Sequence, residues 1–198
     1  MSRGIFVVLE GVDRCGKTSQ GKLLVEMLTR LGREASLFST PDYEGFAGKE
    51  IGDHLRGKQA RDALGFECML IANRYEVAGR VRDALAMGRS AICVRWWQSA
   101  LLYGHASGHE AEVVRRICSS LPEPDLNILV DVNPLEIAER YDRQNIYEQD
   151  LGVQVRLSHA YRKLWEVNGG GDRWPVVDGA KDSVVLAEQI LALALRRL

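Results

Sequence analysis

Short apolar runs and longer stretches with helical spacing alternate along the chain. Apolar runs predict buried strands at 5–9, 34–39, 90–94, 126–131 and 174–177. The stretches around them predict helices at 23–31, 48–55, 62–87, 110–119, from 135 onward, 152–167 and 183–198. Gly104 and Gly108 predict a loosened segment before residue 110. Strands that alternate with helices predict an α/β fold, a doubly wound, five-stranded parallel sheet flanked by helices on both faces.

A phosphate-binding pattern follows the first apolar run directly. Residues 11–18 fit G-x-x-x-x-G-K-[ST], with a predicted strand before them and a predicted helix after them. Glycines let backbone N–H groups turn toward an anion, and the following helix points its positive end at the same place. Lys17 adds a full charge, and the Thr18 hydroxyl can bind Mg²⁺. The pattern predicts binding of nucleotide phosphates, and the flanking elements argue against a chance match on a glycine-rich turn.

Composition narrows the class of protein. The 198 residues are 46% hydrophobic, and no linker rich in Pro, Gly or Ser interrupts them, so we expect one domain over 1–198. The 26 basic and 27 acidic residues nearly balance, which indicates no general attraction to nucleic acid or to a membrane surface. Four scattered cysteines, one of them inside the loop, read as reduced thiols of a cytoplasmic protein.

Polar groups at two further places leave alternatives open. Arg95 follows the third predicted strand, at the sheet edge where α/β proteins bind ligands, which makes it a candidate ligand group. The sequence Asn-Arg-Tyr-Glu at 73–76 is unusually polar for a helix; a solvated face with an Arg–Glu pair is the simpler interpretation. The polar stretch at 139–150 is typical of a mobile lid and equally of a solvated connection.

These stretches together resemble the thymidylate kinase family of P-loop nucleoside monophosphate kinases, from residue 6 to about 183. The matching pieces lie in order at 9–18, 41–43, 48–49, 72–76, 95–96, 99–103, 124–126, 129–134, 147–148, 156 and 161. Most pieces are weak individually. Their order and spacing are specific, because an aspartate two places after the first loop glycine, here Asp13, is not a general feature of P-loops.

The resemblance implies transfer of the γ-phosphoryl group of ATP to dTMP, giving dTDP, with Mg²⁺, by a cytoplasmic homodimer. The implied ATP site comprises Gly11, Gly16, Lys17, Thr18, Ser19, Arg140 and Lys181, with Thr18 near the metal. Arg14 resembles the arginine that some members direct at the γ-phosphate, and Arg143 would lie in the lid. Catalytic roles are implied for Lys17, Arg14, Arg95 and Asp13.

The resemblance also implies how the acceptor would be held. Arg95 would bind the dTMP phosphate with Tyr43 nearby, and Asp13 would meet the sugar 3′-hydroxyl. Tyr103 and Tyr147 would crowd the 2′ position and favour deoxyribose.

For the base, Arg74 would donate to thymine O4, where cytosine carries a donor amino group instead. Leu70 and Ser99 would line the base pocket.

Three positions depart from the family pattern. Val94 stands where the family usually has an aspartate that organises Mg²⁺ and the phosphates. Leu70 replaces a phenylalanine that stacks on thymine in many members, and Gly104 replaces a glutamine. The departures at 70 and 104 motivate one alternative, a kinase for another deoxynucleoside monophosphate. Val94 motivates another, a nucleotide-binding homologue with weak catalysis.

Overall fold

A parallel sheet forms the centre of the molecule. The computed structural model describes residues 3–59, 61–140 and 145–198. Within these ranges the strands are ordered β2-β3-β1-β4-β5. They comprise β1 (Phe6–Glu10), β2 (Ala35–Ser39), β3 (Ser90–Val94), β4 (Leu126–Asp131) and β5 (Val176–Asp178). All neighbouring strands pair in parallel, so the predicted fold class is confirmed.

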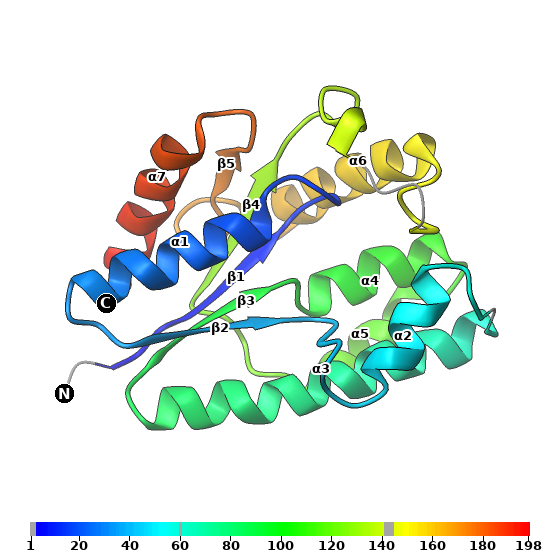
Figure 1. The fold of residues 1–198 in the computed structure, drawn as a ribbon, viewed down its shortest axis with the longest axis horizontal. Helices are drawn as coiled ribbons and strands as arrows, with labels where there is room; N and C mark the ends of the chain where they lie inside the picture. The colour runs from blue at the N-terminus through cyan, green and yellow to red at the C-terminus, as the bar shows by residue number, and fades with distance from the viewer. Residues whose placement is uncertain (1–2, 60, 141–144) are drawn as a thin grey trace.

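Helices cover both faces of this sheet. Those of the described residues are α1 (Lys17–Arg30), α2 (Gly48–Leu55), α3 (Ala63–Ala86), α4 (Trp97–Ala106), α5 (Ala111–Cys118), α6 (Leu151–Val167) and α7 (Ser183–Leu195). Figure 1 shows α1 and α7 together on one face and α3 on the other. None of the helices in the described ranges is long and apolar enough to cross a bilayer.

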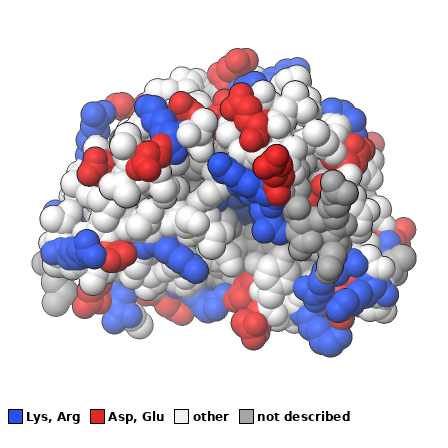
Figure 2. All heavy atoms as spheres, turned by 45° about the horizontal axis from the view of Figure 1, so that its top comes forward, with Lys and Arg blue, Asp and Glu red and all other residues white. Residues whose placement is uncertain are grey.

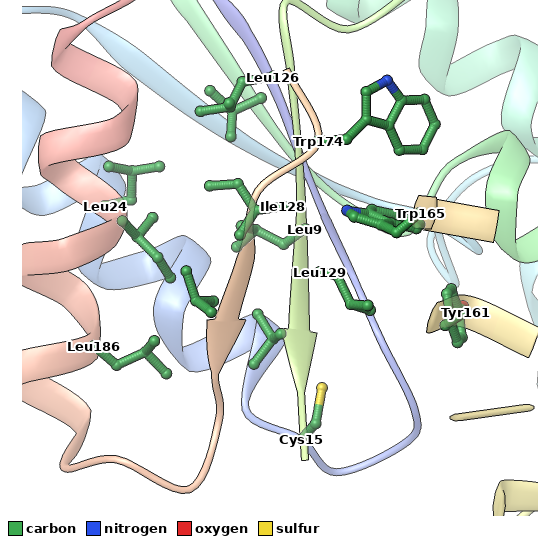
Figure 3. Close-up of a cluster of buried hydrophobic side chains, with 14 of the residues drawn as sticks. Leu9, Cys15, Leu24, Leu126, Ile128, Leu129, Tyr161, Trp165, Trp174 and Leu186 are labelled. Atoms are coloured by element: carbon green, nitrogen blue, oxygen red, sulfur yellow. The ribbon is translucent and has the colours of Figure 1, made fainter. Parts of the chain in front are cut away.

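Alternate residues of the central strand β1 pack into two separate hydrophobic cores, one on each face of the sheet. Val7 and Leu9 pack with α1, α6 and α7 in a cluster that includes Trp165 and Trp174 (Figure 3). Phe6 and Val8 point the other way, into a cluster with α3, α4 and α5. Every residue of β1 is buried, which explains why this strand is a continuous apolar run that ends in a single acid.

Two predicted elements differ from those observed. Trp97–Ala106 forms the helix α4, and its last three residues fall in the segment 104–108, where we expected a loosened chain. This helix contacts both α5 and α6, so its sequence lacks the polar stripe that marks a surface helix. The helix expected from residue 135 is, within the described residues, only the 3₁₀ turn Ala138–Arg140. None of the three residues of this turn is buried, so the turn itself buries too little apolar surface to support a longer helix.

Candidate functional site: three adjoining cavities

The phosphate-binding pattern folds as a loop between β1 and α1, as its context predicted. Gly11 and Gly16 have φ values of 145° and 99°. A Cβ atom at Gly11 would come within 2.5 Å of the Val130 carbonyl oxygen, so both the dihedral and the space require glycine. Helix α1 begins directly after the loop, and Lys17 is its first residue. The loop therefore has the helix N-terminus and the free backbone needed for anion binding.

Lys17 is held in place below the loop. Its side chain is buried, and Nζ donates to the Val12 carbonyl oxygen at 2.5 Å. Burial lowers the pKa of Lys17, and the nearby charge of Arg95 lowers it further. An anion beside Nζ would relieve both effects, so this ammonium group favours a phosphate.

A polar cavity opens in front of the loop. It has a volume of about 400 Å³ and is lined by Asp13, Arg14, Gly16, Lys17, Thr18, Ser19, Val94, Arg95 and Glu148. Figure 2 shows a hollow in the molecular surface with basic side chains inside it and acidic ones beside them. We call this the phosphate cavity. Arg14 Nε donates to Glu148 Oε2 at 2.9 Å in its wall.

A second, narrower cavity adjoins the first. It is lined by Asp13, Thr40, Pro41, Tyr43, Leu55, Glu67, Leu70, Arg74, Arg95, Ser99, Ala100, Tyr103, Asn145 and Tyr147. Every residue predicted for dTMP binding is in this lining. We call it the acceptor cavity. Asp13 and Arg95 line both cavities and so lie where they meet.

A third cavity continues the line on the other side of the loop. Arg140 and Lys181, which are far apart in the sequence, both line it, together with Gly16 and Ser19. The last two also line the phosphate cavity. Of the residues predicted for ATP binding, all but Gly11 therefore line one or both of these neighbouring cavities.

Arg95 is the most heavily contacted side chain at the junction. Its backbone has φ 67°, immediately after β3, which turns the side chain across the sheet edge. Nη1 donates to Ser99 Oγ and to the Tyr161 hydroxyl, each at 3.0 Å. Nη2 donates to Asp13 Oδ1 and to the Tyr103 hydroxyl. These contacts fix the plane of the guanidinium before any ligand arrives.

Asp13 receives hydrogen bonds from several directions. Besides Arg95, Tyr103 and Gln154 Nε2 donate to Oδ2 at 3.0 and 2.9 Å. Burial alone would raise the pKa of Asp13, but the charges of Arg95 and Lys17 and these hydrogen bonds outweigh it and lower the pKa. Asp13 is therefore an ionised acceptor at neutral pH.

Gln154 on α6 ties the loop to the segment around Tyr147. It is fully buried; Oε1 accepts from the Asp13 backbone N–H at 3.0 Å, and Nε2 donates to the Tyr147 carbonyl oxygen at 2.9 Å. A glutamine can do both because its amide carries an acceptor and a donor. No sequence pattern pointed to this residue.

Glu10, at the end of β1, supports the same junction from below. Its buried Oε1 accepts from the backbone N–H groups of Trp96 and Ser99, at the start of α4. Its Oε2 accepts from Ser99 Oγ at 2.7 Å and from the Tyr161 hydroxyl at 3.0 Å. Glu10 thus positions two of the groups that hold Arg95.

The polar sequence at 73–76 does not form the solvated face that was the simpler interpretation. Asn73 and Arg74 are 0% and 2% exposed. Asn73 Nδ2 donates to the carbonyl oxygens of Asp42 and Phe46, which fastens the loop after β2 to α3. Within the described residues, Arg74 Nε and Nη1 are buried without a hydrogen-bond partner, and the side chain lines the acceptor cavity.

Val94 forms an apolar part of the phosphate cavity wall and is 6% exposed. The candidate replacements for the missing carboxylate are Glu10, Asp13, Asp42 and Asp131. Asp131 accepts from Arg162 Nε at 2.9 Å, Asp42 pairs with Arg80, and Glu10 accepts from the start of α4. Of these four acids Asp13 alone lines this cavity, where Glu148 is the other carboxylate. Arg143, predicted for the lid, lies outside the described residues.

Comparisons with known proteins identify the family of the chain. A family profile described as thymidylate kinase matches residues 9–190. The chain is 33% identical to a thymidylate kinase of Caenorhabditis elegans over 188 residues, covering 86% of this chain and 85% of that protein. It is 29% identical to one of Danio rerio, covering 97% and 93%. A solved thymidylate kinase from Candida albicans shares the fold, with a TM-score of 0.83 at 22% identity over 99% of this chain and 93% of the other. The chain belongs to the thymidylate kinase family.

Proposed function

We propose that this protein transfers the γ-phosphoryl group of ATP to the 5′-phosphate of dTMP, giving dTDP and ADP. The observation that carries the proposal is the junction of the two cavities at Asp13 and Arg95. A donor phosphate chain on the loop and an acceptor phosphate at Arg95 would meet there end to end. Phosphoryl transfer needs little more from a protein than such positioning and the neutralisation of charge.

In the donor half of the site, basic residues line both the third cavity and the phosphate cavity. The third cavity, with Arg140 and Lys181, is suited to the adenosine end of ATP, and the loop amides with Lys17 to its phosphates. Arg14 lines the same phosphate cavity and is half-exposed, so its guanidinium can reach the transferring group. Negative charge that builds up during transfer would then be balanced by Lys17, Arg14 and Arg95.

The acceptor half suits a deoxynucleoside monophosphate. Arg95 has a fixed guanidinium plane for the phosphate, and charge-assisted hydrogen bonds of this kind contribute about 1.5 to 3 kcal/mol each. Asp13 is an ionised acceptor for the sugar 3′-hydroxyl. The rings of Tyr103 and Tyr147 meet edge to face with centroids 5.1 Å apart, and this pair would narrow the space beside the 2′ carbon. Arg74 Nε and Nη1, which have no hydrogen-bond partner among the described residues, would be donors for thymine O4.

The residues of the phosphate cavity fit Mg²⁺ bound mainly through substrate. Mg²⁺ usually keeps several waters and binds one or two carboxylates plus substrate phosphates. The Thr18 hydroxyl and the carboxylates of Asp13 and Glu148 line the cavity, while the described residues contain no cluster of three or more acidic, His or Cys ligands. Thr18 would hold the ion with the ATP phosphates, and the ion would neutralise part of their charge.

A second candidate function is nucleotide binding with little catalysis. It is favoured by Val94, an apolar side chain in the wall of the phosphate cavity where family members usually have a carboxylate. The alternative kinase, for another deoxynucleoside monophosphate, is favoured by Leu70, which lines the acceptor cavity, and by Gly104, which packs against Glu67 of that lining.

A coupled assay that follows ADP release by a colour change tests these candidate functions together. ATP would be supplied with dTMP, dCMP or dGMP in turn, at several Mg²⁺ concentrations. We expect Mg²⁺-dependent turnover with dTMP as the best acceptor. If dTMP is no better an acceptor than dGMP or dCMP, the assignment of dTMP as substrate is wrong. If ATP and dTMP bind without turnover, the protein is a nucleotide-binding homologue with little catalysis.

The proposal also covers the domain organisation, the oligomeric state and the location of the protein. One sheet draws strands from residues 6–178, which supports a single domain over 1–198. A homodimer through α3 is supported by Leu64, which is 55% exposed on that helix, although Phe66, Ile71 and Val77 of the same helix serve the monomer core. Light scattering that gives the mass of one chain would exclude the dimer. The unpaired cysteines of the described residues suit the cytoplasm.

A further inference from the structure

Glu67 is a buried acid in the acceptor cavity to which no pattern in the sequence assigned a role. Its residue is 4% exposed, and it lines the cavity together with Leu70 and Arg74. Positions 67, 70 and 74 lie on one face of α3, because helical neighbours recur every three to four residues. Glu67 therefore belongs to the wall that we assign to the base.

The carboxyl group of Glu67 lacks the partners that a structural acid would have. Within the described residues its Oε1 is buried without a hydrogen-bond partner, as are Nε and Nη1 of Arg74. Burial raises the pKa of Glu67, and the charges of Arg74 and His109 offset this only in part. A buried acceptor without a partner destabilises the fold, because its lost hydrogen bonds to water are not replaced. The Glu67 carboxyl group is therefore suited to a ligand that donates a hydrogen bond to it.

We propose that Glu67 is a specificity-determining residue for the base: its Oε1 accepts the ring N3–H of thymine, beside the Arg74 guanidinium that donates to O4. This inference rests on the proposed function, whose acceptor is dTMP. It adds a second point of recognition on the same edge of the base. A carboxyl oxygen accepts in either protonation state, so the contact does not depend on ionisation of Glu67.

The chemistry of the base edges explains what such a pair selects. Thymine presents an acceptor at O4 and a donor at N3, which match Arg74 and Glu67 in turn. Cytosine presents the reverse, a donor amino group at C4 and an acceptor at N3, so both contacts become mismatches. Guanine also pairs an acceptor with a ring N–H, so this pair of contacts separates thymine from cytosine and not from guanine.

The neighbouring helix leaves room for this acid. A Cβ atom at Gly104 on α4 would lie 3.5 Å from both Cδ and Oε2 of Glu67. The carboxyl group thus packs against backbone that carries no side chain. Gly104 therefore lies behind Glu67, which itself lines the cavity.

The test compares Glu67→Ala and Glu67→Gln with the unchanged protein. Each would be assayed for kcat/KM with dTMP, dUMP and dCMP, and for monophosphate binding by calorimetry without ATP. The dUMP arm is an internal control, because uracil has the same O4 and N3–H groups as thymine. Cys68→Ser is the matched control variant: it is the next residue of α3, and its side chain is exposed.

We expect Glu67→Ala to lower kcat/KM for dTMP and dUMP alike by about 10-fold or more, as for a lost hydrogen bond to a charged group. The dTMP to dCMP ratio should fall by a similar factor while the dTMP to dUMP ratio stays constant. Glu67→Gln keeps the shape and adds an N–H donor for cytosine N3, so it should raise dCMP turnover and lower the same ratio. Cys68→Ser should leave all ratios within about twofold.

The proposal would be overturned if, in both variants, the dTMP to dCMP ratio of kcat/KM stays within about twofold of that of the unchanged protein. An equal loss of kcat/KM for all bases is such a result. Failure of the proposed function shows separately, in the unchanged protein. If that protein binds dTMP but does not turn it over, the binding ratios still decide the role of Glu67. If it does not bind dTMP, both proposals are wrong.

Discussion

Arg95 forms an ion pair with Asp13 at the line where the phosphate and acceptor cavities meet. Arg95 directly follows β3, and Asp13 lies in the loop that follows the neighbouring strand β1, so the pairing of these strands brings the two residues together. The two charges hold each other in place: Arg95 lowers the pKa of Asp13, and Tyr103 together with Asp13 raises the pKa of Arg95, although burial opposes both shifts. An acceptor phosphate therefore meets an arginine that is already oriented.

We predict that Arg95→Lys lowers kcat/KM for dTMP by about 100-fold or more. A lysine has one ammonium group and cannot make the forked contacts of a guanidinium, so about two charge-assisted hydrogen bonds are lost. Steady-state kinetics with dTMP measures the effect. Arg162→Lys is the control, because Arg162 pairs with Asp131 on the surface. Its kcat/KM should stay within about twofold; an equal loss in both variants would contradict a special role for Arg95.

We predict that Gln154→Glu changes the pH dependence of kcat/KM. In Gln154→Glu the new carboxylate faces Asp13 and has no N–H to donate, so like charges meet in a buried site. We expect kcat/KM about 10-fold below the unchanged protein at about pH 8, with partial recovery toward about pH 6 as one carboxyl group takes up a proton. The pH profile of kcat/KM is the measurement.

The control for this variant is Ser158→Ala, one turn further along α6. Ser158 is 3% exposed, and its hydroxyl has no hydrogen-bond partner within the described residues. The profile of this control should match that of the unchanged protein. A Gln154→Glu profile parallel to it would show that Gln154 only stabilises the fold.

The strands and the loop were predictable because their sequences carry strong local signals. Continuous apolar runs identify strands that are buried on both faces, and the glycines of the loop occupy positions that only glycine fits well. The resemblance then placed Arg95, Arg74 and Tyr103, and all three line the acceptor cavity.

The helix α4 and the polar residues Glu67 and Gln154 were not predictable in this way. Helix α4 packs against neighbours on more than one side, so it has no polar stripe to mark its period. Glu67 and Gln154 are ordinary residues for exposed helix positions, and only tertiary packing buries them. Their roles depend on segments that lie far away in the sequence.

Val94→Asp should restore a carboxylate to the wall of the phosphate cavity. Lys17, Arg14 and Arg95 line the same cavity and would keep the new group ionised. We expect half-maximal activity at about 10-fold lower Mg²⁺, since an outer carboxylate typically changes metal affinity or activity by about 10- to 100-fold. Val94→Asn provides the neutral control. If both variants require the same Mg²⁺ concentration as the unchanged protein, Val94 is not what limits this site.

Glu67→Gln should stabilise the fold at neutral pH. The pKa of Glu67 is raised in the folded state, so the unfolded chain ionises first as pH rises, and stability falls between the two pKa values. Replacing the acid with an amide removes that loss. Thermal unfolding should give a higher Tm for the variant at about pH 7, and the difference should shrink toward about pH 4, where both states are protonated. A Tm difference that does not depend on pH would contradict the raised pKa.

Direct detection of products tests the central claim most closely. The unchanged protein would be mixed with ATP, Mg²⁺ and dTMP, and the nucleotides separated by anion exchange; Lys17→Ala would be run beside it. We predict dTDP and ADP in equal amounts, with dTDP essentially absent for Lys17→Ala. ADP formed without dTDP, or a monophosphate other than dTMP phosphorylated as fast, would contradict the assignment of this protein as a dTMP kinase.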